Sequence, residues 1–305
     1  LLGDLIGSTA GWIRFIRGNH DDSRAERGRE YVISLATLVL AAVCAWGAVE
    51  HQIRQPIQMA MRRALGVNGE VHMGPPTPAV PYIHPQHVTL GDDTRNDDLV
   101  LLRGFPHLKY LTIRSHHISD EGLVHLADLN ELRFVTIESM HVTNKGLEHL
   151  QNAAFITNLA FPNSQVTPHG VKSLKCHSFI QSLDLRGTGI HDEDLLPLHS
   201  MTSLTMLNVD RTKVTSQGIE SLPQLKSLQW LYVADCGWND ASLSFLPQCL
   251  ALTGIDVSGN DISPAILPLL QQVPRLTRFY ALRTDITEQD ADQIEATLPK
   301  LQVHE

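Results

Sequence analysis

The feature that most constrains the fold of this chain is a 24-residue repeat that recurs from residue 108 to residue 300. Each copy opens with Leu or Ile at the same spacing: Leu108, Leu132, Ile156, Ile180, Leu204, Leu228, Leu252 and Leu276. A fixed period of this length is typical of a solenoid, in which each unit buries its apolar face only by stacking on its neighbours. The eight repeats therefore predict a stack of similar units that share one continuous core.

The pattern inside one repeat predicts its local structure. Positions 1, 4, 6, 11, 16 and 19 are apolar, which in the first copy are Leu108, Leu111, Ile113, Ile118, Leu123 and Leu126. Positions 4 and 6 alternate with polar residues, the period of a short strand. Position 12 is mostly Ser, Thr or Asn, which are preferred at helix N-caps. Each repeat should be a strand, a turn and a helix, and stacking should give an α/β solenoid with a concave parallel sheet and convex helices.

Four stretches resemble a known repeat family: SDEGLVHL (119–126), TNKGLEHL (143–150), TPHGVKSL (167–174) and TSQGIESL (215–222). They are similar to leucine-rich repeats (LRR), most closely the 24-residue bacterial type and the cysteine-containing subtype of F-box substrate receptors. The usual Asn of position 9 is kept only as Asn260, and Thr188, Thr212, Thr284 and Cys236 replace it as in this subtype. The resemblance implies a solenoid that binds a protein partner. No segment resembles an F-box, so a ligase-receptor role is not implied.

An apolar stretch precedes the repeats. Residues 31–49 carry no charge, and a helix of this length spans about 28 Å, close to the roughly 30 Å core of a bilayer. Tyr31 and Trp46 lie near its two ends, where aromatic rings favour the membrane interface. The stretch predicts a single-pass transmembrane helix. A cleaved signal peptide is the alternative, because Ala45 and Gly47 have the small-residue spacing of a cleavage site, and the repeat protein would then be soluble and exported.

Basic residues and prolines divide the chain around this stretch. Arginines before it outnumber those after it: Arg14, Arg17, Arg24, Arg27 and Arg29 against Arg54, Arg62 and Arg63. The positive-inside rule then predicts a cytoplasmic N-terminus and an exported repeat domain. The predicted organisation is a tail (1–30), a transmembrane helix (31–49), a juxtamembrane segment with a Pro-rich linker (50–87), and a repeat domain (88–305) that comprises a degenerate cap (88–107) and eight repeats (108–300).

Positions 3, 5, 7 and 8 of each repeat are expected to project from the concave sheet, where they could bind a partner. In the later repeats the candidates are Met206, Asn208, Asp210, Arg211, Trp230, Tyr232, Asp235, Asp256, Arg278, Tyr280 and Arg283. A smaller candidate patch nearer the cap comprises Tyr110, Arg114, Phe134 and Glu138. Exposed Trp, Tyr and Arg together are typical of interface hot spots. The alternative is a ladder of side chains that only stabilises the sheet.

Other classes of function find little support in the sequence. The net charge is −9 and the pI is near 5.9, which gives no electrostatic reason to expect a nucleic-acid partner. The chain contains no phosphate-binding loop, HExxH, GxSxG or paired CxxC motif, so we predict that it is not an enzyme and has no cofactor. An acidic cluster, 192–194, lies at a helix start, where the helix dipole favours carboxylates. Cys236 and Cys249 occupy repeat positions that predict small core residues.

Histidines recur at equal offsets, with His117 one repeat before His141 and His125 one repeat before His149. Such pairs could share a metal ion, but no third ligand follows at the same spacing. We therefore predict a solvated surface and no metal. After the eighth repeat, Leu301 and Val303 begin a ninth strand, whose edge could pair with a second copy of the chain.

Overall fold

The computed structural model describes residues 70–74 and 84–305, with the exception of residues 175 and 223–225. It divides the chain into two compact units, one up to Asp93 and one from Thr94 to Glu305. The predicted tail, the predicted transmembrane helix 31–49 and the linker before residue 70 lie outside the described residues. Within the described part of the chain, no helix is long and apolar enough to cross a membrane.

The first unit contains a strand pair where the sequence predicted a linker (50–87) and the start of the degenerate cap (88–107). Strands β1 (Glu70–Gly74) and β2 (His84–Leu90) pair antiparallel, and their register shifts between His72 and Met73. Pro85 lies opposite Met73 at this irregularity. A proline has no N–H to donate to the ladder and is therefore tolerated in a strand at such a bulge. The prolines led the sequence analysis to predict a linker in place of β2. The strand tolerates Pro85 because its pairing with β1 is irregular there.

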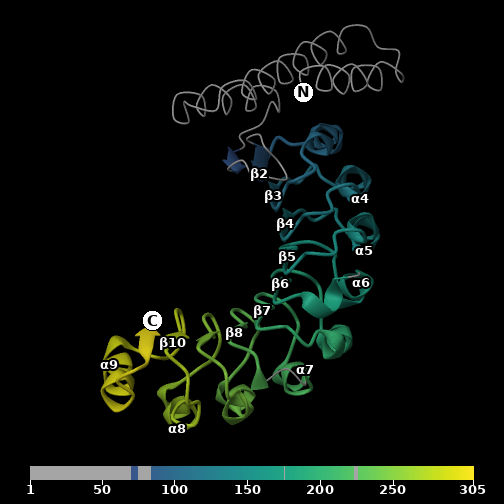
Figure 1. Cartoon of the computed structure of the whole chain (residues 1–305). Helices are drawn as coiled ribbons and strands as arrows, with labels where there is room; N and C mark the ends of the chain where they lie inside the picture. The colour runs from purple at the N-terminus through teal and green to yellow at the C-terminus, as the bar shows by residue number, and fades with distance from the viewer. Residues whose placement is uncertain (1–69, 75–83, 175, 223–225) are drawn as a thin grey trace, which may run out of the picture. The chain divides into compact units, whose positions relative to one another are not determined.

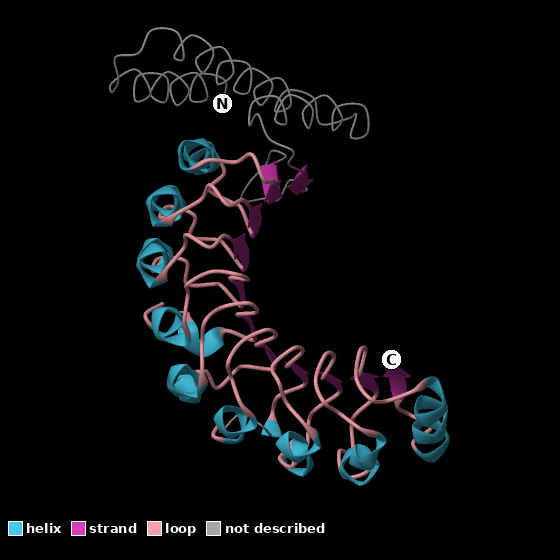
Figure 2. Ribbon diagram, turned by 180° about the vertical axis from the view of Figure 1, so that it is seen from behind, coloured by secondary structure: helices cyan, strands magenta, loops and turns pink. Residues whose placement is uncertain are grey.

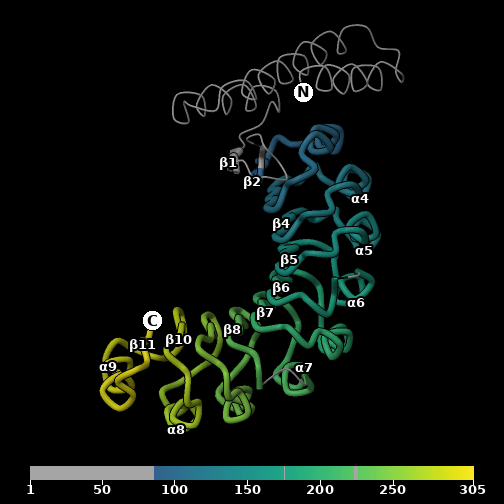
Figure 3. Tube along the Cα trace, viewed as in Figure 1, coloured from purple at the N-terminus to yellow at the C-terminus, as the bar shows by residue number. Residues whose placement is uncertain are grey.

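The second unit is built on a parallel sheet. Its strands follow in chain order: β3 (Tyr110–Arg114), β4 (Phe134–Glu138), β5 (Asn158–Ala160), β6 (Ser182–Asp184), β7 (Met206–Asn208), β8 (Trp230–Tyr232), β9 (Gly254–Asp256), β10 (Arg278–Tyr280) and β11 (Gln302–His304). Every neighbouring pair is parallel and in a register of 24 residues, as in Leu207 opposite Leu231. Figures 1 and 3 show these strands as successive rungs of one curved stack. The predicted solenoid is confirmed, including the ninth strand.

The segments that return to the next strand are short and partly 3-10 helical. They are η1 (Asn96–Gly104), α4 (Asp120–Leu123), η2 (Val124–Leu126), α5 (Asn144–Leu147), η3 (Glu148–Leu150), α6 (Pro168–Lys172), η4 (His177–Phe179), η5 (Asp192–Ser200), α7 (Ser216–Glu220), η7 (Asp240–Leu243), η8 (Leu246–Gln248), η9 (Pro264–Ile266), α8 (Leu267–Leu270) and α9 (Glu288–Thr297). Figure 2 shows the helices on the outer side and the strands on the inner side of the curve. Because helical segments are wider than strands, this arrangement bends the stack toward the sheet.

The core lies between sheet and helices and is formed by the repeated apolar positions. Positions 4 and 6 of the repeats are buried, as in Leu231 and Val233. Position 11, elsewhere Ile or Val, is Trp238 in the sixth repeat. Its ring packs edge-on to Phe245 at 6.0 Å, and its Nε1–H donates to the Val214 carbonyl at 2.9 Å. A buried indole is stable there because its one donor has a partner.

Position 12 links neighbouring repeats more than it caps helices. The backbone N–H and hydroxyl of Thr143 donate to the Asp120 carboxylate of the preceding repeat, at 2.8 and 2.7 Å. The same pair of hydrogen bonds joins Thr215 to Asp192, and Thr215 makes no side-chain cap. Position 12 is the N-cap residue as predicted, but its side chain accepts the capping hydrogen bond in only some repeats, such as that of Thr143 and not that of Thr215.

The glycine of the motif at position 15 has a steric explanation. A Cβ on Gly146 would lie 2.6 Å from Oδ1 of Asp120 and 2.7 Å from Cδ1 of Leu123, both too close for an unstrained contact. A Cβ on Gly170 would likewise collide with the side-chain amide of Asn144. Glycine therefore leaves space for the side chain through which the preceding repeat binds position 12.

Candidate partner-binding face

The concave face of the Thr94–Glu305 unit is formed by positions 3 and 5 of the strands. In β8, Leu231 is buried whereas Trp230 and Tyr232 on either side are half-buried. This alternation follows from the pleat, which sends successive side chains to opposite faces of a sheet. Since the helices cover the face that carries position 4, positions 3 and 5 lie on the open inner side of the curve in Figure 2.

Trp230, Tyr232 and Arg278 form a connected group, here called the aromatic platform. The Trp230 ring lies across Gly254 of the next strand, where any Cβ would collide with its six-membered ring. The Arg278 guanidinium carbon lies over the same ring, 5.4 Å from the centroid, in cation–π geometry. Tyr232 stacks on Trp230 with centroids 5.8 Å apart and planes 13° from parallel. Glycine in β9 is thus what allows three residues from β8 and β10 to meet.

A second stacked pair continues this surface toward the C-terminal strand. The rings of Tyr280 and His304 lie 4.5 Å apart and 16° from parallel. Both occupy position 5, as do Tyr232 and Asp256, so Asp256 lies on the strand between the two tyrosines. Sequence reasoning did not include His304 among the candidates. The available signal was its offset of 24 residues from Tyr280.

Three carboxylates, here called the carboxylate row, accompany the rings: Asp184, Asp210 and Asp256. Asp210 accepts a hydrogen bond from the Ala234 N–H at 2.7 Å, and Asp256 accepts one from the Ser258 N–H at 2.9 Å. These bonds orient the carboxylates without neutralising them. Asp184 was not among the sequence candidates, although it occupies position 5 like Tyr232.

Electrostatics within the carboxylate row are unfavourable to the ionised state. Burial raises the pKa of Asp210 to about 6, and repulsion from Asp256 and Asp184 adds to the effect. Burial also raises the pKa of Asp184, against the opposing influence of Arg186, whose Nε lies 3.6 Å from Oδ2. Burial raises the pKa of Tyr232 as well, with Tyr280 and Asp256 as further causes. Burial and mutual repulsion therefore destabilise the charged forms of these groups on the concave face.

Two of the predicted contact residues have packing roles. Asn208 is buried, and its Oδ1 accepts from the Asp210 N–H at 2.9 Å, so it positions the chain beside the carboxylate row. Asn208 therefore offers little surface to a partner, although position 5 lies on the concave side. Met206 is half-buried, and its Sδ accepts from the Ser182 hydroxyl at 3.2 Å. Met206 remains partly accessible beside Trp230 of the next strand.

Position 8 lies in a turn after the strand and not on the sheet, contrary to the sequence prediction. Arg211, Asp235 and Arg283 have positive φ values of 53°, 53° and 56°. Arg283 reaches over Gly259 to Asp235, with Nη2 3.0 Å from Oδ2. Gly259 has a φ of 69°, and a Cβ there would collide with the Asp235 carboxylate. These residues form the rim of the concave face.

The smaller predicted patch is also assembled by the structure. Tyr110 and Phe134 occupy position 3 of β3 and β4, and their rings stack at 4.7 Å and 19°. Their exposed fractions of 37% and 38% leave much of both rings open to solvent. Arg114 is exposed at the end of β3, and Glu138 accepts from the Asn163 amide at 2.9 Å. The concave face therefore has an aromatic pair near its N-terminal end in addition to the aromatic platform.

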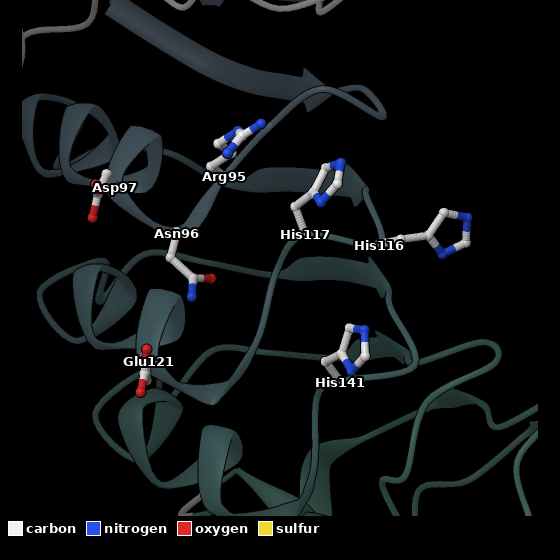
Figure 4. Close-up of a pocket in the computed structure, with 7 residues that line it drawn as sticks. All are labelled: Arg95, Asn96, Asp97, His116, His117, Glu121 and His141. Carbon is white, nitrogen blue, oxygen red and sulfur yellow. The ribbon is translucent and has the colours of Figure 1, made fainter.

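Of the two predicted histidine pairs, His117 with His141 is exposed, whereas His125 with His149 is half-buried. His117 and His141 are exposed and line a hollow of about 480 Å³, together with Arg95, Asn96, Asp97, His116 and Glu121. Figure 4 shows the rings of His117 and His141 on successive turns, with His116 directed away from them. Among the described residues, no group of three or more His, Cys, Asp or Glu side chains is arranged to hold a metal ion. His125 and His149 are half-buried, and burial lowers the pKa of His125.

The remaining reactive groups have structural surroundings. Burial raises the pKa of the Cys176 thiol to about 11 and that of Cys249 to about 12, which disfavours the nucleophilic thiolate. Cys236 is half-buried with its Sγ 3.2 Å from the Val209 carbonyl, and burial raises its pKa too. Asp192, from the acidic cluster, serves as the acceptor for Thr215 described above.

Comparison with known families agrees with this repeat architecture. The family profile described as Leucine Rich repeat matches residues 106–127 and 176–198. These two segments are similar to leucine-rich repeats, and the structure repeats the same strand, turn and helical segment in the other described units. No curated protein matches the sequence.

Several solved structures are similar to this chain. An internalin of Listeria monocytogenes (inlF) is 19% identical with a TM-score of 0.46, and the alignment covers 72% of this chain and 58% of that one. A leucine-rich-repeat protein of Leptospira interrogans is 17% identical with a TM-score of 0.45, covering 68% and 57%. A second internalin of Listeria monocytogenes is 24% identical with a TM-score of 0.43, covering 60% and 74%. This chain therefore spans less than two thirds of the length of the first two.

Proposed function

We propose that this chain is a non-catalytic leucine-rich-repeat scaffold that binds a protein partner through its concave face. The observation that carries the proposal is the aromatic platform of Trp230, Tyr232 and Arg278 on the open side of the sheet. Trp, Tyr and Arg dominate the energetics of protein interfaces. Here their rings are already stacked, so binding would cost little further loss of side-chain freedom.

The alternative, a ladder that only stabilises the sheet, explains part of the platform but not its surroundings. Stacking of Trp230 on Tyr232 and Arg278 would by itself stabilise the sheet. The neighbouring carboxylate row has the opposite effect, because burial, together with repulsion from Asp256 and Asp184, raises the pKa of Asp210. Residues that lower stability on an open surface are expected where a ligand completes the site.

Replacing Trp230 and Tyr232 with alanine tests this proposal. The full chain, tagged, is crosslinked to its neighbours in native envelopes, and the captured proteins are compared between variants. We expect the double alanine variant to lose at least 90% of the capture, a loss of about 1.4 kcal/mol or more, because a partner would lose two interface anchors. The melting temperature should fall only modestly, since both side chains are only half-buried, and the variant should stay folded at the temperature of the assay.

A matched control removes two aromatic rings from outside the concave face. Phe155 and Phe179 are 62% and 63% exposed and precede β5 and β6 in the loops. Their alanine variant should capture the same proteins as the unmodified chain. Capture that survives the loss of Trp230 and Tyr232, or that depends equally on the two phenylalanines, would contradict the proposal.

We also propose that residues 31–49 anchor the protein in a membrane and that the repeat domain is exported. The uncharged run and the excess of preceding arginines support this. Extraction of membranes with alkaline carbonate separates anchored from peripheral proteins, and the chain should remain in the pellet. Release into the supernatant of a chain shortened by about 47 residues would instead support signal cleavage, at the small-residue site of Ala45 and Gly47.

A further inference from the structure

The C-terminal half of the concave face suggests the chemistry of what binds there. We infer that the partner presents a lysine or arginine side chain, which lies between Tyr232 and Tyr280 and is bound by the carboxylates of Asp256 and Asp210. The inference rests on the proposed function and specifies its partner: an extended, basic polypeptide segment.

The strand register brings these groups together. Tyr232, Asp256 and Tyr280 face one another at position 5 of β8, β9 and β10. Neighbouring strands are about 4.8 Å apart, so the backbones of the two tyrosines lie roughly 10 Å apart with Asp256 on the strand between them. Asp210 lies just beyond the end of β7, and its influence on the pKa of Tyr232 places it near the same ring. Two rings and two carboxylates thus line one side of the sheet.

The bonds that the two carboxylates make leave their charge uncompensated. Asp210 accepts from the Ala234 N–H and Asp256 from the Ser258 N–H, which are neutral donors. Among the described residues, the carboxylate of the row that forms an ion pair is Asp184, whose Oδ2 lies 3.6 Å from Nε of Arg186. Arg278, the basic residue of the platform, lies over the Trp230 ring. A cationic side chain of a partner would supply the positive charge that pairs with Asp210 and Asp256.

The rings favour the same kind of ligand. The faces of tyrosine and tryptophan attract ammonium and guanidinium groups, and this attraction strengthens as water is excluded. The contact between Arg278 and Trp230 is an intramolecular example on the same surface. An ammonium or guanidinium group between Tyr232 and Tyr280 would combine this attraction with ion pairing.

Other partner chemistries fit less well. An acidic segment would meet repulsion from Asp184, Asp210 and Asp256. An apolar segment would cover these carboxylates and remove them from water without an ionic partner, which strongly disfavours binding. Charge complementarity therefore selects a basic segment over an acidic or an apolar one.

Synthetic peptides of one length and background test the inference, with a central Lys, Arg, Gln, norleucine or Glu. Binding to the full chain is measured by fluorescence polarisation at low and physiological salt. Lys and Arg peptides should bind about ten-fold more tightly than the Gln and norleucine peptides, and the Glu peptide most weakly. Norleucine is the informative comparison, because it keeps most of the lysine stem and lacks the charge.

Two variants and a control locate the effect. Asp210→Asn and Asp256→Asn should each reduce the preference for Lys over norleucine by at least about three-fold, since each removes one carboxylate charge. Asp292→Asn, on the exposed side of α9, changes the net charge equally and should leave the preference unchanged. Melting curves of the three variants exclude unfolding as the cause of any loss.

The pH dependence adds an independent readout. The groups that interact with Asp210 are Asp184, Asn208, Tyr232, Cys236 and Asp256, and burial raises the pKa of Asp210 to about 6. Protonation removes the charge that attracts the ligand, so the Lys preference should fall as the pH is lowered from 7.5 to 5. Asp210→Asn should make this fall smaller.

The results separate the inference from the proposed function. Binding that requires Trp230 but does not distinguish Lys from norleucine would overturn the inference and leave the proposed function intact. Binding of none of the peptides would also overturn the inference. The proposed function fails only in the crosslinking experiment, if capture does not depend on Trp230 and Tyr232.

Discussion

Replacing Asp210 with asparagine tests whether the concave face lowers the stability of the fold. The carboxylate lies half-buried beside Asp184 and Asp256, and burial together with repulsion raises its pKa from 3.8 to about 6. An asparagine has the same shape and keeps an oxygen that can accept the 2.7 Å hydrogen bond from Ala234. The substitution therefore removes the charge with little change in packing.

The sign of the effect follows from proton linkage. A carboxyl whose pKa is raised in the folded state binds its proton more tightly there than in the unfolded chain. Asp210 therefore costs no stability below pH 3.8, where both states are neutral. The cost grows between pH 3.8 and about 6 and is fully present above that. The asparagine variant should match the unmodified chain in acid and exceed it at neutral pH.

The magnitude follows from the same shift. A shift of about two pKa units corresponds to roughly 3 kcal/mol as an upper limit. Solvent reaches part of the carboxylate and screens it, so we expect a gain of about 1–2 kcal/mol for Asp210→Asn at pH 7.5. In a domain of this size such a gain raises the melting temperature by about 2–8 °C.

Urea denaturation of the full chain at pH 4, 5, 6 and 7.5, followed by circular dichroism, measures this difference. The dependence on urea concentration should be the same for both proteins, so that the midpoints report stability. Asp292→Asn, an exposed carboxylate on α9, controls for the change in net charge. A variant that is no more stable at pH 7.5, or a difference that does not vary with pH, would refute the reasoning.

Two further predictions concern a glycine of helix α5 and the buried cysteines. Gly146→Ala should destabilise the fold by about 1–3 kcal/mol, because the new Cβ would lie 2.6 Å from Oδ1 of Asp120. Gly189→Ala, with no atom within 4 Å of its Cβ, is the control and should change the urea midpoint far less. Cys176 and Cys249 should resist a thiol reagent at pH 7.5 until the chain unfolds, since burial raises their pKa values to about 11 and 12. Rapid modification of either thiol in the native protein would contradict their burial.

Two patterns stabilise the unit, and both join adjacent repeats. Leu231 and Val233 are buried by residues at equivalent positions of the adjacent repeats. Thr143 and Thr215 are bound by Asp120 and Asp192 of the repeat before. Both patterns act only between neighbours, as expected of a solenoid. The concave face can therefore differ between repeats without loss of the scaffold, and its aromatic groups lie at two separate places along it.

Position along the repeat was enough to predict the scaffold. Leu111 and Ile113 are buried because they stand at positions 4 and 6, whatever the residues at positions 3 and 5. A ninth strand was predicted from Val303 for the same reason and is present as β11. Such predictions succeed because burial in a solenoid follows from a local period that every copy repeats.

The sequence alone determined the period, the parallel register and the faces of the strands, whereas the tertiary structure decided which side chains meet. Trp230 reaches Arg278 because Gly254 leaves the space between them open. Arg283 binds Asp235 two repeats away over a second glycine. Asn208, an expected contact, is buried, and Asp184, an unexpected one, joins the carboxylates. Backbone positions repeat with the period, but side-chain contacts depend on rotamers, neighbouring residue size and local charge, which differ in every repeat.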